Sequence, residues 1–137
     1  PLKQAYLGGK MIQIVPSDSQ TTGTTQIDQS KVITWWETIA PHCDLFFKTF
    51  NVLDASLSNS QIAEAYIHLN SHYMAIEAAE FPHQAKYARR YLLGAMSNVM
   101  AVYTAALEGK ISVSNRRMKH AQSQMENFKS VLSDLLD

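Results

Sequence analysis

The sequence lacks most of the features that would indicate a function directly. It has one cysteine, so no disulfide can form within the chain. Charged residues make up only 18% of it, and its 12 basic residues balance 12 acidic ones. Because proteins that bind nucleic acid normally carry a basic excess or a basic face, we expect no nucleic-acid partner.

Long apolar runs and enzyme motifs are missing as well. No run approaches the roughly 20 apolar residues that are needed to cross a bilayer, so we expect no transmembrane segment in this chain. A glycine-rich phosphate loop, a GxSxG nucleophile elbow, an HExxH helix and a CxxCH haem attachment motif are all absent from the sequence. We therefore expect a non-enzymatic protein that carries no cofactor.

Residues 1–27 are predicted to be an extended arm and a tether. The stretch "KMIQIV", Lys10–Val15, alternates weakly and is compatible with a short strand, whereas Ser17–Gln26 contains no apolar residue and is typical of a flexible tether. Such tethers often join a membrane anchor or an exported N-terminus to a domain, although they also join domains inside cells. The chain begins with Pro1 rather than Met, so we expect a processed or trimmed product. These features favour a location outside the cytoplasm, tethered at a bacterial cell surface.

Residues 28–137 carry a strong helical pattern. Apolar residues recur at alternating steps of three and four in four separate runs, the first of which is Val32, Trp36, Ile39, Cys43, Phe46, Phe50 and Leu53. A 3.5-residue apolar repeat is typical of helices that pack side by side along a shared seam. The pattern predicts an all-α, antiparallel, up-down-up-down four-helix bundle with helices near 29–54, 60–79, 83–108 and 113–136.

Residues at the expected helix ends support this division. Ser58 or Ser60 can cap the second helix, Pro82 can open the third, and Gly109 can end it. The short connections favour antiparallel neighbours. Pro41 falls inside the first helix, which we predict to continue as one bent helix because the apolar repeat runs through it. Six residues are expected to be nearly fully buried: Phe46, Phe50, Leu92, Val99, Phe128 and Leu132.

The stretch "EAYIHLNSHYM" raises the question of a metal site. It spaces Glu64, His68 and His72 four residues apart, so a helix would place all three on one side. At 100° per residue, however, His72 lies on the shoulder of the apolar stripe, His68 lies further out, and Glu64 lies nearly opposite the core. Ligands that face outward lack the supporting residues that orient them. We therefore predict a polar shoulder here rather than a dedicated zinc site.

His42 lies on the matching shoulder of the first helix. Two arrangements are open for His42 and His72: the imidazoles approach each other between the first two helices, or both turn toward other neighbours. Only the first arrangement permits a shared metal. We predict the second, because no carboxylate is placed to orient either ring.

A second candidate site combines sulfur and imidazole ligands. Counting turns along an antiparallel bundle places Cys43, Met96 and Met125 at a similar depth, with His42 and His72 on nearby shoulders. One thiol, two thioethers and two imidazoles would suit a soft metal or a haem iron. Methionine and free cysteine are also common core residues with no further role. These five residues are the metal-ligand candidates of the chain.

The aromatic residues offer another surface. Adjacent residues on a helix diverge, so we predict that only one of Trp35 and Trp36 points inward. With Phe47, Tyr87 and Tyr91, the other could form an exposed apolar patch, which would mark a partner surface; packing against the N-terminal arm is the alternative. The function we predict is a non-enzymatic helical-bundle domain that acts through protein–protein contact. A metal- or haem-binding four-helix bundle is the alternative.

Overall fold

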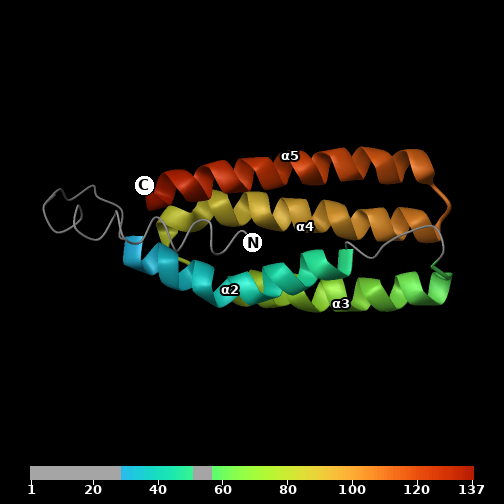
Figure 1. Cartoon of the computed structure of the whole chain (residues 1–137), viewed down its shortest axis with the longest axis horizontal. Helices are drawn as coiled ribbons and strands as arrows, with labels where there is room; N and C mark the ends of the chain where they lie inside the picture. The colour runs from blue at the N-terminus through green and yellow to red at the C-terminus, as the bar shows by residue number, and fades with distance from the viewer. Residues whose placement is uncertain (1–28, 51–56) are drawn as a thin grey trace, which may run out of the picture.

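The computed structural model describes residues 29–50 and 57–137, which fold into long α-helices (Figure 1). The elements are α2 (Gln29–Phe50), α3 (Asn59–Ala78), the short 3-10 helix η1 (His83–Ala85), α4 (Lys86–Leu107) and α5 (Ile111–Leu136). The described ranges contain four α-helices and no strand, which confirms the prediction of an all-α four-helix fold. The predicted arm over 1–27 and the predicted end of the first helix at 51–54 lie outside the described residues.

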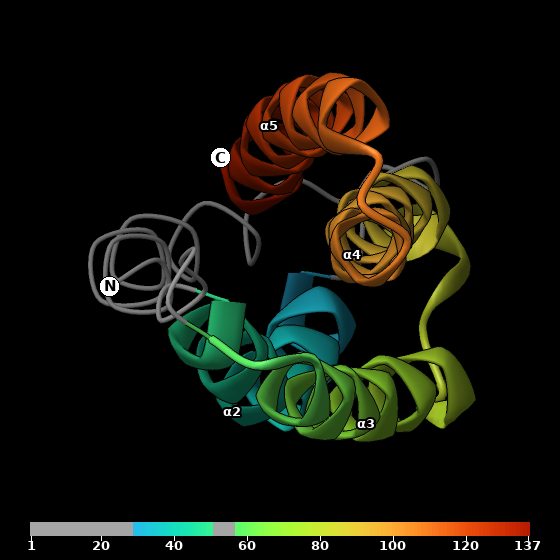
Figure 2. The same cartoon turned by 90° about the vertical axis from the view of Figure 1, so that its right-hand side faces the viewer.

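The four helices lie alongside one another along the length of the molecule and surround a common interior when they are viewed end-on (Figure 2). Near one end, the Gln29 side-chain amide donates to the carbonyl of Leu135 at 3.3 Å. Further along, the ring of Trp36 packs against that of Phe128, with centroids 5.6 Å apart. Residue numbers rise along α2 as they fall along α5, so these two helices run in opposite directions. The colour order in Figure 1 shows that each helix also runs opposite to the next one in the sequence.

Side-chain and backbone caps explain where α3 begins and α4 ends. At the start of α3, the Ser58 hydroxyl accepts from the Gln61 backbone N–H at 3.2 Å, while the Gln61 side chain accepts from the Ser58 N–H at 2.8 Å. This reciprocal pair is a capping box. At the end of α4, Gly109 adopts a φ of 72°, and the Lys110 N–H reaches back to the carbonyl of Ala105 at 2.9 Å. That closure is a Schellman motif, which favours glycine at the left-handed position.

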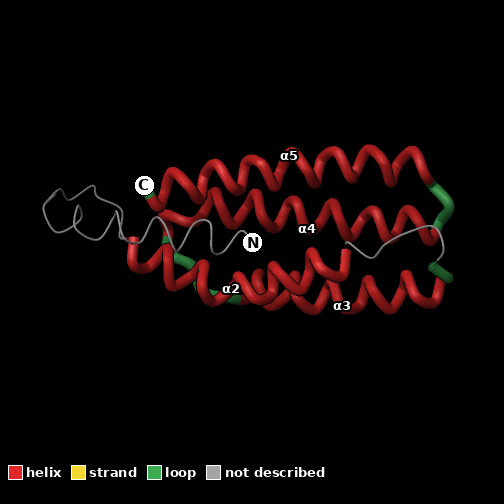
Figure 3. Tube along the Cα trace, viewed as in Figure 1, coloured by secondary structure: helices red, strands yellow, loops and turns green. Residues whose placement is uncertain are grey.

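Two boundaries differ from the prediction by more than one residue. The residues after Pro82 first form η1, and α4 begins only at Lys86, three residues later than expected. The last helix, α5, begins at Ile111, two residues earlier than expected, and no side chain caps it. In the first helix, α2 continues through Pro41 to Phe50, so the prediction of one helix rather than two is confirmed for its described part (Figure 3).

The interior is apolar, and most of the predicted core residues are found there. Phe46, Leu92, Val99, Phe128 and Leu132 are buried, as predicted. The prediction for the sixth residue, Phe50, is wrong, because its side chain is only partly buried and packs against the edge of the core. Its position explains the difference: Phe50 is the last residue of α2 and lines a groove next to α5, and α2 makes far less contact with α5 than α4 does.

Candidate functional site

Two histidines from neighbouring helices meet between α2 and α3. His42 follows Pro41 in the second half of α2, and His72 lies in the second half of α3. Their Nδ1 atoms are 3.1 Å apart, and their ring centroids are 5.4 Å apart with an angle of 47° between the planes. Both side chains are half-buried. The prediction that the two rings turn away from each other is therefore wrong.

A hydrogen bond between the rings explains this arrangement. A neutral imidazole has one N–H donor and one bare nitrogen acceptor, so one ring can donate its Nδ1–H to the Nδ1 of the other. This hydrogen bond satisfies both Nδ1 atoms, so no carboxylate is needed to orient the rings. The spacing of His42 and His72 placed them on matching shoulders, but spacing does not give the side-chain rotation that decides which way each ring turns.

The surroundings favour the neutral form of His72. The pKa of His72 lies below its usual value of 6.5, mainly because burial removes water from the ring and secondly because His42 and His68 are close by. Burial and a nearby positive charge both disfavour the imidazolium ion. His72 is therefore neutral at neutral pH, and a neutral imidazole is the form that binds a metal ion.

The other two polar residues of the sequence stretch do not join the pair. His68 lies one turn before His72 on α3 and is exposed, and Glu64 is exposed one turn earlier. Within the residues that the structure describes, no group of three or more His, Cys, Asp or Glu side chains is arranged to hold a metal ion. The structure thus brings together one cross-helix pair, His42 and His72.

The sulfur residues occupy the core and its margin. Cys43 and Met96 are buried, whereas Met125 is half-buried and lines a groove of about 190 Å³ between α2 and α5. Burial, and secondly the charge of Asp44, raise the pKa of the Cys43 thiol to about 12. The thiol therefore keeps its proton at neutral pH. Since the thiolate is the form that binds metals and attacks electrophiles, Cys43 is poorly prepared for either role.

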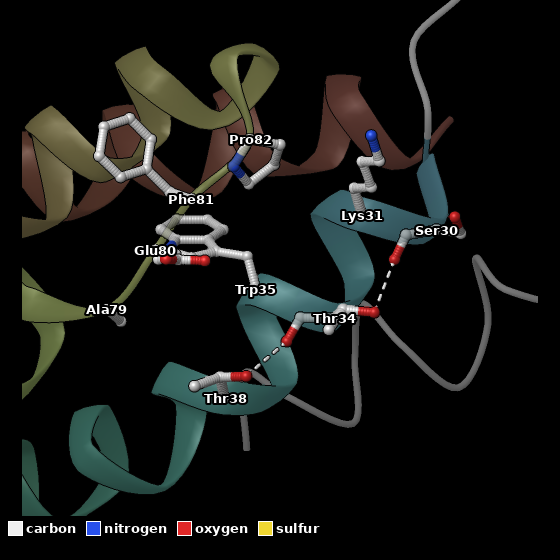
Figure 4. Close-up of a pocket in the computed structure, with 9 residues that line it drawn as sticks. All are labelled: Ser30, Lys31, Thr34, Trp35, Thr38, Ala79, Glu80, Phe81 and Pro82. Carbon is white, nitrogen blue, oxygen red and sulfur yellow. Dashed lines mark hydrogen bonds between the residues drawn. The ribbon is translucent and has the colours of Figure 1, made fainter.

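A larger groove, which the sequence did not indicate, lies between the start of α2 and the connection from α3 to α4 (Figure 4). Its volume is about 510 Å³, and Trp35 lines it together with Phe81 and Pro82 of the connection. Trp35 and Trp36 are both buried, at 2% and 1% exposure. The prediction that only one of them points inward is wrong, because Trp36 packs on Phe128 in the core while residues of the connection pack around Trp35.

At the corner where α3 passes into α4, Phe81 lines this groove, and cations lie beside its ring and beside the ring of Tyr87 in the first turn of α4. We name this the corner surface, and its residues are Phe81, Lys86, Tyr87, Arg89 and Arg90. The aromatic side chains are 40% exposed for Phe81 and 56% exposed for Tyr87. The Arg89 guanidinium lies 4.4 Å from the centroid of the Phe81 ring. Lys86 and Arg90 approach the centroid of the Tyr87 ring at 5.5 and 5.3 Å.

The corner surface is only partly the aromatic patch that the sequence suggested. Tyr87 is exposed as that patch required, but Phe47 and Tyr91 are half-buried and pack against the core. Phe81 was missed because it lies outside the predicted helices, so no helical periodicity indicated where its side chain would point. Its place next to Arg89 is set by the turn between α3 and α4, where Arg89 also donates to the carbonyl of Glu77 at 2.9 Å.

Comparison with known proteins adds no functional information, because no family model, curated protein or solved structure matches the chain. Among the helices of the described residues, none is both long and apolar enough to cross a membrane.

Proposed function

We propose that this chain is a non-enzymatic helical-bundle domain that acts through protein–protein contact, and that the corner surface is where the partner binds. The observation that supports this most directly is the exposure of Phe81 and Tyr87, each with a guanidinium beside its ring. Phe81 also lines the groove of about 510 Å³. Aromatic residues and arginine are enriched in protein interfaces and contribute much of their binding energy.

The charges of the corner surface favour an acidic partner. A helix N-terminus favours negative charge, yet the first turn of α4 contains no acidic residue. Lys86, Arg89 and Arg90 instead place three cations within the first two turns of this helix. An Asp or Glu side chain of a partner would relieve their mutual repulsion. Because Glu80 itself lines the groove, we expect the partner to place its carboxylate at Lys86 and Arg90 and an apolar side chain in the groove near Trp35.

Two other features support parts of this proposal. The buried, protonated thiol of Cys43 argues against a cysteine nucleophile and against a soft-metal or haem site built on Cys43, Met96 and Met125. The composition of residues 17–26, which is rich in Ser, Thr and Gln, supports display of the domain on a tether outside the cytoplasm.

Site-specific photo-crosslinking in an extract of the source cells tests the proposal. A photoreactive phenylalanine derivative is placed at Tyr87, and a matched control carries it at Ile67, an exposed apolar position on α3 that is 67% exposed. We expect a discrete adduct with one protein from position 87 and none from position 67. The adduct should weaken as salt concentration rises and should be lost when Arg90 is changed to Glu, because the contact depends on opposite charges.

The result that would contradict the proposal is equal labelling from both positions, or labelling from position 87 that Arg90→Glu leaves unchanged. Either result would mean that the corner surface is ordinary solvent-exposed surface. Tyr87→Ala tests the contact without a crosslinker and should fold normally, because substitutions at such exposed positions usually change stability by about 0.5 kcal/mol or less. Loss of partner binding in that variant would then reflect the interface rather than the fold.

A further inference from the structure

The histidine pair between α2 and α3 points to a function separate from the corner surface. We infer that His42 and His72 chelate a divalent transition-metal ion through their Nδ1 atoms and that the bound ion links α2 to α3. The two nitrogens already converge to 3.1 Å from two different helices, and both rings are only half-buried. An ion in solution can therefore reach them.

The distance between the nitrogens suits a shared metal ion. Zinc binds imidazole nitrogen at about 2.0–2.1 Å, so two Nδ1 atoms 3.1 Å apart correspond to a nitrogen–metal–nitrogen angle of about 98°. A tetrahedral angle would need a separation of about 3.3–3.4 Å at the same bond length. The two nitrogens must therefore move apart by only a few tenths of an ångström, and each ring must also turn so that its Nδ1 lone pair points at the ion.

Binding also requires a change in the position of one proton. In the hydrogen-bonded pair, one ring carries a proton on Nδ1, and a metal ion needs the lone pair of both Nδ1 atoms. The protonated ring can move that proton to Nε2, which keeps the ring neutral. This shift of a proton within one ring creates no charge other than that of the metal ion itself.

The ligand set defines the class of metal. Neutral imidazoles favour Cu²⁺, Ni²⁺ and Zn²⁺, with Cu²⁺ bound most tightly by a given nitrogen site. Since no group of three or more His, Cys, Asp or Glu ligands occurs in the described part of the chain, two protein ligands hold the ion and its other positions stay open to water or to a partner. An open site of this kind predicts exchangeable binding in the micromolar range rather than a permanent structural metal.

The test is a titration of the metal-free chain with Zn²⁺ and, separately, with Cu²⁺, followed by calorimetry and by the thermal unfolding midpoint. We expect one equivalent to bind to the wild type and to raise its midpoint, because a ligand that binds only the folded state stabilises it. His42→Ala and His72→Ala should each weaken binding by at least about tenfold and abolish the rise in midpoint. Far-UV circular dichroism at the starting temperature shows whether each variant keeps its helices.

Two further variants make the outcome specific. His120→Ala removes an exposed histidine from α5 and should bind as the wild type does. His68→Ala separates the cross-helix pair from the pair that His68 and His72 form along α3, and it should keep most of the affinity. Binding that is unaffected by His42→Ala would overturn the inference, as would wild-type binding weaker than the micromolar range. Should an alanine variant unfold, His42→Gln, which keeps a polar side chain of similar size, replaces it in the same comparison.

Discussion

The loss of one aromatic ring from the core should cost far more free energy than the loss of another ring at its edge. Phe128 is fully buried and packs against Trp36 with centroids 5.6 Å apart and ring planes at 45°. Phe128→Ala leaves a cavity between α2 and α5 and should lower the free energy of unfolding by about 3–5 kcal/mol. A typical domain has only about 5–15 kcal/mol in total, so the variant should be close to unfolding.

Phe50→Ala is the matched control for this prediction. The Phe50 ring centroid lies 6.2 Å from that of Tyr103, but the Phe50 side chain is only half-buried. Its truncation therefore removes less buried apolar area than truncation of Phe128 does. We expect a loss of about 1–2 kcal/mol, a fraction of the value for a fully buried phenylalanine. Phe128→Leu, which keeps most of the volume, should cost about 1.5 kcal/mol or less.

Urea unfolding followed by far-UV circular dichroism measures these differences, provided that the slope with denaturant is the same for all variants. A loss below about 1 kcal/mol for Phe128→Ala would mean that Phe128 does not fill the core as described. If Phe50→Ala lowers the free energy of unfolding as much as Phe128→Ala does, or more, then burial does not determine these energies and the prediction is refuted.

Three other predictions concern caps, glycines and pH. Ser58→Ala should lower the free energy of unfolding by about 1 kcal/mol in urea titration, because it removes one half of the capping box, and no change would mean that the cap is not formed in solution. Gly94→Ala should raise the unfolding midpoint, since a helical glycine costs about 1 kcal/mol relative to alanine and the new Cβ would meet only a flexible glutamine side chain at 3.2 Å. Gly109→Ala should instead lower the unfolding midpoint, because a residue with a Cβ is strained at the φ of 72° found there. A change of the midpoint in the same direction in both variants would contradict this prediction. Burial raises the pKa values of Cys43 and Tyr103 from 9.0 and 10.0 to about 12, so the unfolded chain loses these protons first and stability should decrease from about pH 9 to pH 12. Denaturant midpoints measured across that range should decline less steeply in Tyr103→Phe and in Cys43→Ala, and parallel declines in all three proteins would exclude these groups as the cause.

The fold was largely predictable because its determinants are local. The apolar repeat that runs from Val32 to Phe50 fixes which face of α2 is buried, and the same reasoning applies to the other three helices. Ser58 and Gly109 marked helix ends through hydrogen bonds that their own neighbours supply. Boundaries were least accurate at η1 and at the start of α5, where no side-chain cap marks the first residue.

The candidate sites were harder to predict because they depend on which side chains meet. The sequence placed His42 and His72 on matching shoulders, but only the packing of α2 on α3 brings their Nδ1 atoms to 3.1 Å. Trp35 could not be assigned to the interior from its own helix, because residues that follow α3 pack around it. Phe50 belonged to the apolar repeat, yet its burial depends on how closely α5 approaches the end of α2.

The sequence by itself therefore determined the helices, their apolar faces and the types of residue available for binding. Only the tertiary structure decided that two imidazoles share a hydrogen bond, that a groove opens beside Trp35, and that Phe81 and Tyr87 are exposed among cations. The physical reason is the separation along the chain of the residues that interact. Helix formation depends on hydrogen bonds and periodicity within a few residues. The histidine pair and the groove beside Trp35 instead depend on rotamers and on contacts between segments that are 30 or more residues apart, as His42 and His72 are.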